Sequence, residues 1–229
     1  MVSERMAEVL RLLRRDDWPD HSQRGAVALG VDGISASVAL DAGPAELLWC
    51  SADASRRFED LQFTLGEGPA VEAARTGHAV LEADLRQVRP ERWPLLLPEA
   101  ERLPVQAVFC FPLGIGAIHL GVLTAVRAAP APLGRQQTDD ALALAAALTA
   151  QYLGGDEPPG VFYRAVVHQA VGMVSVQLSL PLADSMLRLR AFSYRSGRPI
   201  NDVSRDVVAR RLRLDANGNG SHTNAVEKD

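Results

Sequence analysis

Phe63-Thr64-Leu65-Gly66-Glu67-Gly68-Pro69-Ala70 is the stretch that decides how the first part of this chain is interpreted. Its two glycines allow a tight turn, and a proline is favourable at the first position of a helix. We therefore predict a helix over 69–76. On both sides of it, the alternation of apolar residues predicts strands. These form two strand pairs, 33–40 with 45–51 and 105–113 with 118–127, and one further strand at 79–83.

Helices are predicted at both ends of this region. Apolar residues at three- and four-residue spacing indicate an amphipathic helix over 1–17, which ends before Pro19 because the residue preceding a proline avoids the helical conformation. An Ala- and Leu-rich pattern indicates another helix over 138–153. Apart from 69–76, residues 20–128 are interpreted as strands and turns.

The Ala- and Leu-rich helix also suggests an oligomeric state. Ala141, Ala145 and Thr149 recur every four residues and are small enough for close helix packing across a two-fold axis. We therefore expect a homodimer. The alternative is that the two terminal helices simply pack on their own sheet.

A polar, Gly- and Pro-rich run at 154–160 is the clearest break in the chain. Beyond it, apolar periodicity predicts three helices, at about 161–178, 181–196 and 201–213. We divide the chain into an N-terminal helix (1–19), an α+β domain with an antiparallel sheet flanked by helices (20–153), a linker (154–160), a small all-α domain (161–214) and a disordered tail (215–229).

Charge follows the same division. The chain has 229 residues and a formal net charge of −4. Residues 1–160 carry 14 Arg and 22 Asp plus Glu, a net of −8, whereas residues 161–214 carry 9 Arg and 3 Asp, a net of +6. The tail supplies the remaining −2. A short basic module after a larger acidic one is typical of a protein in which one part meets a polyanion.

Several functions are disfavoured by composition. The chain has a single lysine, Lys228, so no internal lysine can serve a phosphate-binding loop or a Schiff base. The five histidines lack metal-ligand spacing, and Cys50 and Cys110 are expected to be inert thiols within strands. We expect no catalytic residue, metal or cofactor. No apolar run reaches the roughly 20 residues of a bilayer span, and the charged N-terminus is unlike a signal peptide, so a cytoplasmic location is expected, without membrane association.

Motifs in the first domain resemble the GAF domains common in actinobacterial regulators. They are residues 63–70, Thr76-Gly77, Asp84-Leu85, Arg92-Trp93 and Phe111-Pro112-Leu113. The resemblance covers about residues 20–153. It implies an antiparallel sheet flanked by helices, with a cavity for a small-molecule ligand between sheet and loops. It does not identify that ligand.

Motifs in the second domain resemble the ANTAR domain, a three-helix RNA-binding module of transcription antiterminators. They are residues 168–174 (His-Gln-Ala-Val-Gly-Met-Val), Ala183 with residues 189–193 (Leu-Arg-Ala-Phe-Ser), and residues 198–204 (Arg-Pro-Ile-Asn-Asp-Val-Ser). The resemblance covers about residues 160–213. The chain departs from the family's frequent residues at two positions, with Val171 in place of Lys and Ser204 in place of Ala.

Together the two resemblances imply a transcription antitermination regulator in which a GAF sensor controls an RNA-binding ANTAR domain. Its partner would be paired hairpin loops in nascent transcripts. The candidate RNA-binding residues are Gln169, Arg188, Arg190, Tyr194, Arg195 and Arg198. We expect Arg190, Arg195 and Arg198 to share one basic surface with Gln169 near it. We also expect a close helix–helix approach at Gly172, because a glycine inside a helix otherwise lowers its stability.

The alternative function is a DNA-binding regulator of the helix-turn-helix type with a GAF ligand sensor. Three short basic helices also suit that motif. An enzyme built on the GAF scaffold is a more distant possibility, because no catalytic spacing supports it.

Overall fold

The computed structural model describes residues 1–13, 18–38, 46–116, 118–154, 163–215 and 219–222. The chain divides into two units, residues 1–160 and residues 161–229. Each unit is described by itself.

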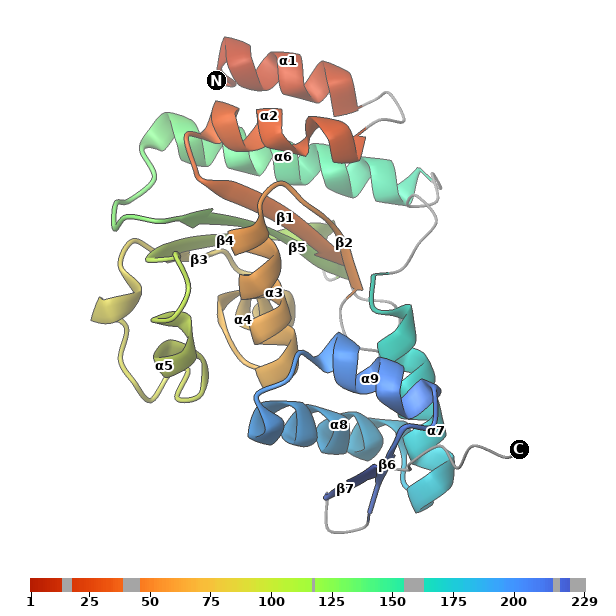
Figure 1. The fold of residues 1–229 in the computed structure, drawn as a ribbon. Coiled ribbons are helices and arrows are strands. Elements are labelled where there is room, and N and C mark those ends of the chain that lie inside the picture. Colours follow the sequence, from red (N-terminus) through yellow and green to blue (C-terminus); the bar gives the residue numbers. More distant parts are fainter. Residues whose placement is uncertain (14–17, 39–45, 117, 155–162, 216–218, 223–229) are drawn as a thin grey trace. The chain divides into compact units, whose positions relative to one another are not determined.

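A five-stranded sheet forms the centre of the first unit (Figure 1). Its strands are β1 (Gly33–Val38), β2 (Glu46–Cys50), β3 (Val80–Glu82), β4 (Ala107–Ile115) and β5 (Ile118–Arg127). They lie in the order β2-β1-β5-β4-β3, and every neighbouring pair is antiparallel. The predicted strand pairs are therefore confirmed as β1 with β2 and β4 with β5.

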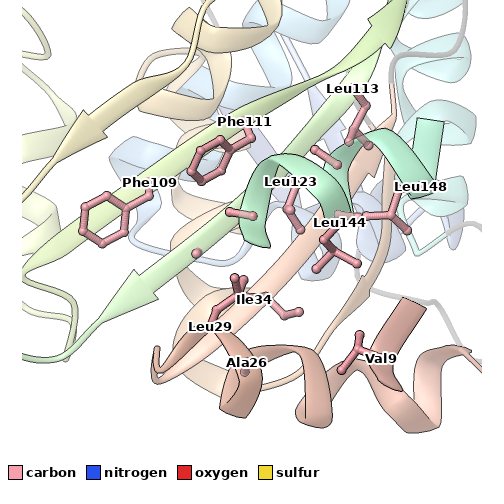
Figure 2. Packing of buried hydrophobic residues seen from close by; sticks show 14 of the residues in the cluster. Val9, Ala26, Leu29, Ile34, Phe109, Phe111, Leu113, Leu123, Leu144 and Leu148 are labelled. Atoms are coloured by element: carbon pink, nitrogen blue, oxygen red, sulfur yellow. The ribbon is translucent and has the colours of Figure 1, made fainter. Parts of the chain in front are cut away.

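Helices α2 (Trp18–Leu29) and α6 (Arg135–Leu153) lie on one face of this sheet, and α1 (Glu4–Leu13) packs on these two helices, as Figure 1 shows. Figure 2 shows the side chains that fill the layer between them and the strands. Ile34, Phe109 and Leu123 point from three adjacent strands toward Leu144 and Leu148 of α6. This apolar layer is the first of two cores in the unit.

Two predictions about these helices are wrong. Helix α2 occupies a segment interpreted as strands and turns, whereas the predicted end of the N-terminal helix, 14–17, lies outside the described residues. The stripe of Ala141, Ala145 and Thr149 does not face a partner, because all three residues are buried against the chain's own sheet. The Thr149 hydroxyl accepts a hydrogen bond from the Gly114 amide at 3.1 Å.

The opposite face of the sheet is covered by α3 (Asp53–Leu65), α4 (Pro69–Thr76) and the connection between β3 and β4, which holds the one-turn 3-10 helix η1 (Leu85–Gln87) and α5 (Leu96–Ala100). Helix α4 has the predicted bounds. Helix α3 was not predicted, because its buried residues include Ser55, Glu59 and Gln62 rather than a continuous apolar stripe. The buried Ser35 hydroxyl of β1 donates a hydrogen bond to the Glu59 carboxylate at 2.9 Å, so this buried carboxylate has a hydrogen-bond partner on the sheet.

The quoted stretch 63–70 holds the β3–β4 connection in place. The Glu67 carboxylate accepts hydrogen bonds from the backbone amides of Leu95 (2.5 Å) and Leu96 (2.7 Å), at the start of α5. A carboxylate at a helix start satisfies amides that have no partner within the helix. Glu67 therefore fixes the position of α5 from a distant part of the sequence.

A second attachment, which we call the loop clasp, joins the same connection to α4 and β3. Arg92 donates hydrogen bonds to Glu72 of α4 at 2.8 and 3.0 Å and to Glu82 of β3 at 2.5 Å. Its guanidinium lies 4.4 Å from the centre of the Trp93 ring, and the Trp93 indole donates to Glu72 at 3.2 Å. The hydrogen bond from Arg92 lowers the pKa of Glu72.

The second unit contains α7 (Ala165–Leu178), α8 (Leu182–Ser196) and α9 (Ile200–Val208), followed by a hairpin of β6 (Leu212–Leu214) and β7 (Gly220–His222). Its buried apolar side chains come from all three helices and from β6. They are Val167, Ala170, Val171, Val174, Met186, Leu189, Ile200, Val203, Val207, Leu212 and Leu214.

The prediction that this unit is entirely helical is wrong. Helix α9 ends at Val208 rather than 213, and Arg210 has a positive φ of 59°, which a helix cannot continue through. Leu212 and Leu214 are then buried in alternation, the pattern of a strand. Strand β7 lies in the predicted disordered tail; residues 216–218 and 223–229 of that tail are outside the described residues, as is 155–160 of the predicted linker.

Two glycines have opposite surroundings, and one of them corrects a prediction. A Cβ at Gly121 of β5 would lie 2.0 Å from the Ser37 carbonyl oxygen of β1. A Cβ at Gly172 of α7 would meet nothing within 4 Å. The expected close helix approach at Gly172 is therefore absent from the described residues.

These surroundings predict opposite effects of alanine on stability. Gly172→Ala should raise the free energy of unfolding by about 0.5–1 kcal/mol, because alanine is the better helix former and has room. Gly121→Ala should lower it by about 1–3 kcal/mol, because the strand backbones must separate. Urea denaturation of both variants measures this. A loss of stability in Gly172→Ala would contradict the open space at that position.

The loop clasp predicts a pH-dependent contribution from Glu72. Glu72→Gln should lower the free energy of unfolding at pH 7 by about 1–2 kcal/mol, since it removes the carboxylate that two donors share at a partly exposed site. Because folding lowers the pKa of Glu72, its contribution is fully present above the unfolded value of about 4.3 and is lost as pH falls through the folded value.

Denaturation between pH 7 and pH 3 measures that dependence. The gap in stability between wild type and Glu72→Gln should close on acidification. Glu91→Gln, an exposed carboxylate in the same connection, is the matched control and should change little. A gap that stays constant down to pH 3 would show that the Glu72 carboxylate is not held by Arg92.

Candidate functional site

A pocket of about 390 Å³ lies within the β3–β4 connection of the first unit. The residues that line it are mainly apolar. Three of these lining residues are prolines at four-residue spacing: Pro90, Pro94 and Pro98. Proline has a fixed φ and no amide donor, so these walls are stiff and offer few hydrogen bonds. The exposed Arg86 guanidinium at the pocket is held by Asp84 through two hydrogen bonds of 2.9 Å. The pocket suits a small, largely apolar molecule.

The sheet face beside this pocket is filled by side chains. Phe58 of α3, Trp93 and Leu96 of the connection and Cys110 of β4 are all buried in a second core. Burial raises the pKa of the Cys110 thiol well above its usual range, which disfavours the thiolate that nucleophilic chemistry requires. The pocket is therefore formed by the connection and the residues just before β4, rather than by the middle of the sheet.

The structure separates the candidate RNA-binding residues of α8. Tyr194, 46% exposed, and Arg195 lie at the surface. Arg188 is partly buried, and so is Arg190, whose pKa is lowered by burial and by the charge of the fully buried Arg164. Arg190 and Arg195 also project on different sides of α8, because five residues correspond to about 140° of rotation. They do not form one exposed face as expected.

The other two candidates lie elsewhere in the second unit. Arg198, between α8 and α9, forms an ion pair with Asp206 at 2.5 Å, and Arg211 binds the same carboxylate at 2.7 Å. These two arginines lower the pKa of Asp206. Gln169 is exposed on α7, where it lines a groove that contains neither of those arginines.

This α7–α9 groove encloses about 960 Å³. Its residues come from one side of α7, the end of α9 and the start of the hairpin: Gln169, Gly172, Met173, Val176, Gln177, Val207, Val208, Arg210, Leu212 and Arg213. Most of this lining is apolar. Val176 is 84% exposed there, which is unusual for a valine in a folded unit.

Two arginines at the groove were missed by sequence reasoning. Arg210 and Arg213 are exposed, and neither forms an ion pair within the part of the chain that the structure describes. By contrast, Arg205 on the exposed side of α9 pairs with Asp202. The alternation of residues 210–214, Arg-Arg-Leu-Arg-Leu, was the available signal for a strand that directs alternate arginines outward.

Membrane and metal sites find little support in the described residues. No single helix among them is long and apolar enough to cross a bilayer; α7 and α8 meet the length and composition criteria only when taken together, with a bend of 107°. No group of three or more His, Cys, Asp or Glu side chains in the described ranges is placed to hold a metal ion.

Comparison with known proteins identifies the fold of the first unit. No protein-family model matches the chain, and no curated protein matches it. Among solved structures, the GAF domain of an Acinetobacter phosphoenolpyruvate-protein phosphotransferase is similar at 13% identity and a TM-score of 0.50, over 67% of this chain and 96% of that one.

Two further structures show a weaker likeness. The GAF domain of the Coxiella burnetii phosphoenolpyruvate-protein phosphotransferase has 17% identity and a TM-score of 0.47, over 66% of this chain and 96% of that one. Free methionine-R-sulfoxide reductase from Neisseria meningitidis, solved with its substrate, has 15% identity and a TM-score of 0.49, over 66% and 87%. None of these matches shows an ANTAR domain. The likeness to the Acinetobacter structure, at a TM-score of 0.50, shows that the five-stranded sheet with its helices has the GAF-domain fold.

Proposed function

We propose that this protein is an RNA-binding regulator of transcription antitermination, in which a GAF-fold sensor controls a basic ANTAR-like unit. The observation that carries the proposal is the separation of charge between the two units. Residues 161–214 have a net charge of +6 after an acidic first unit of −8. The second unit would bind paired hairpin loops in nascent transcripts, in the cytoplasm, where its arginines meet the phosphate backbone.

The surface of the second unit favours RNA over duplex DNA. A helix-turn-helix protein inserts a helix with polar side chains into the major groove. Here the exposed residues in the first turns of α8 are Leu182, Ala183, Leu187 and the acidic Asp184, and the exposed Arg205 of α9 is paired with Asp202. The apolar α7–α9 groove instead borders Arg210 and Arg213, which form no ion pair among the described residues, and such a surface suits the splayed bases of an RNA loop better.

The pocket in the β3–β4 connection supports the sensor part of the proposal. It would take a small, largely apolar ligand between walls whose position depends on Glu67 and the loop clasp. Ligand binding would then shift the population of a state with altered RNA affinity.

A binding comparison with nucleic acids tests this function. The full-length protein should bind an RNA with two short hairpins at least tenfold more tightly than a random duplex DNA of equal length, at matched salt. The reason is that loop bases are accessible whereas duplex bases are stacked. Gel shifts at 150 mM salt measure both affinities. Equal affinity for the random DNA would rule out the proposal in favour of general polyanion binding.

A homodimer remains part of the proposal, with a different surface from the one expected. The exposed side of α6 between residues 142 and 153 is entirely apolar or small: Leu142, Ala146, Ala150 and Leu153. A helix face without a charged residue is suited to packing on a second copy of itself.

Leu142→Glu should therefore convert a dimer to a monomer, because it places a charge in the packed face. Light scattering at micromolar concentration measures the mass. Leu187→Glu, at another exposed leucine, on α8, is the control and should leave the dimer intact. A monomeric wild type would refute this part of the proposal.

A further inference from the structure

We propose that the α7–α9 groove accepts one unstacked RNA base, and that Arg210 and Arg213 bind the phosphates beside it. This inference rests on the proposed RNA-binding function and assigns its site. The site differs from the α8 surface that the sequence suggested, since only Gln169 of the original candidates lines it.

The floor of the groove is apolar. Met173 and Val176 of α7 face Val207 of α9 and Leu212 of β6 across it. Val207 and Leu212 are buried, but Val176 is 84% exposed and Met173 is partly exposed, and the flat face of a base would remove this apolar surface from water without requiring a particular sequence. The polarizable thioether of Met173 adapts to such a flat surface.

The groove also has open space beside Gly172. Glycine is a poor residue for the middle of a helix, yet the described residues place nothing within 4 Å of a Cβ built there. The missing side chain therefore serves no contact inside the unit. It leaves a notch in the wall of α7, one turn from Gln169, at which an incoming ring can approach the helix closely.

Polar side chains form the rim of the groove. The exposed Gln169 amide offers both a donor and an acceptor, which suits the edge of a base. Arg210 and Arg213 supply two exposed guanidinium groups with no ion pair among the described residues. Arg210 adopts a φ of 59° because it terminates α9, where its amide and that of Arg211 donate to the carbonyls of Val207 and Asp206, and this turn places both groove arginines after the helix.

Charge selects RNA over another copy of this unit as the occupant. A second copy would bring its own net charge of +6 toward Arg210 and Arg213, and the two would repel. A phosphate on each side of a flipped base instead matches the two guanidinium groups with opposite charge. The groove thus combines stacking surface, edge recognition and phosphate binding.

Two sets of variants of the full-length protein test the groove. Gly172→Leu fills it, and Ala191→Leu adds the same side chain to the exposed face of α8. The probe is a two-hairpin RNA with 2-aminopurine at one loop position at a time. We expect Gly172→Leu to weaken binding at least tenfold and to remove the fluorescence rise that marks an unstacked base, whereas Ala191→Leu changes neither. Thermal unfolding confirms that both variants are folded.

The arginines are tested by salt dependence, which also serves if Gly172→Leu fails to fold. The double variant Arg210→Gln, Arg213→Gln should lower the slope of log affinity against log salt by more than one unit, because two phosphate contacts are lost. Arg205→Gln removes one positive charge, from a residue already paired with Asp202. This control should lower the salt slope by less than half as much as the double variant does.

The outcomes separate the two proposals. If wild type binds the hairpin RNA but the groove variants bind as tightly as their controls, the groove assignment is wrong while the proposed function stands. If Ala191→Leu rather than Gly172→Leu loses affinity, RNA binds on α8. If wild type binds no hairpin RNA, the proposed function is wrong and the groove assignment falls with it.

Discussion

Burial of both faces of the five-stranded sheet is the constraint on which the rest of the first unit depends. All six residues of β1 are buried, so each face needs its own cover of helices. Helices α2 and α6, with α1 packed on them, cover one face, and α3, α4 and the β3–β4 connection cover the other. The connection has little regular structure, so it relies on Glu67 and the loop clasp to stay on the sheet. Those two attachments also position the connection that supplies the walls of the pocket.

The second unit has fewer residues and is built around three helices rather than a large sheet. Its three helices and hairpin bury an apolar centre but leave Val176 exposed at the α7–α9 groove. Ion pairs occupy Arg198, Arg205 and Arg211, so the net positive charge is not spread evenly over its arginines. Arg210 and Arg213, which border the apolar groove, form no ion pair among the described residues. In the proposed function, this coincidence of charge and apolar surface is what distinguishes an RNA loop from a duplex.

Local signals in the sequence predicted the elements whose buried faces are uniformly apolar or whose ends carry glycine and proline. Helix α4 and the two hairpins of the sheet are of this kind. Helix α3 was missed because Ser55, Glu59 and Gln62 occupy its buried face. The β6–β7 hairpin was missed because its signal is only three residues long. For the candidate site, the sequence pattern identified arginines on the helices. It could not show that Asp206 forms ion pairs with Arg198 and Arg211. Nor could it show that Arg190 is partly buried near Arg164.

The central claim is that RNA binds this protein through its second unit. Ultraviolet crosslinking of the full-length protein to a two-hairpin RNA, followed by mass spectrometry of the attached peptides, tests it most directly. The account predicts crosslinks in peptides that contain residues 169–177 of α7 and residues 207–213 after α9. Crosslinks confined to the exposed face of α8 would overturn only the groove assignment, whereas crosslinks confined to residues 1–160 would contradict the central claim.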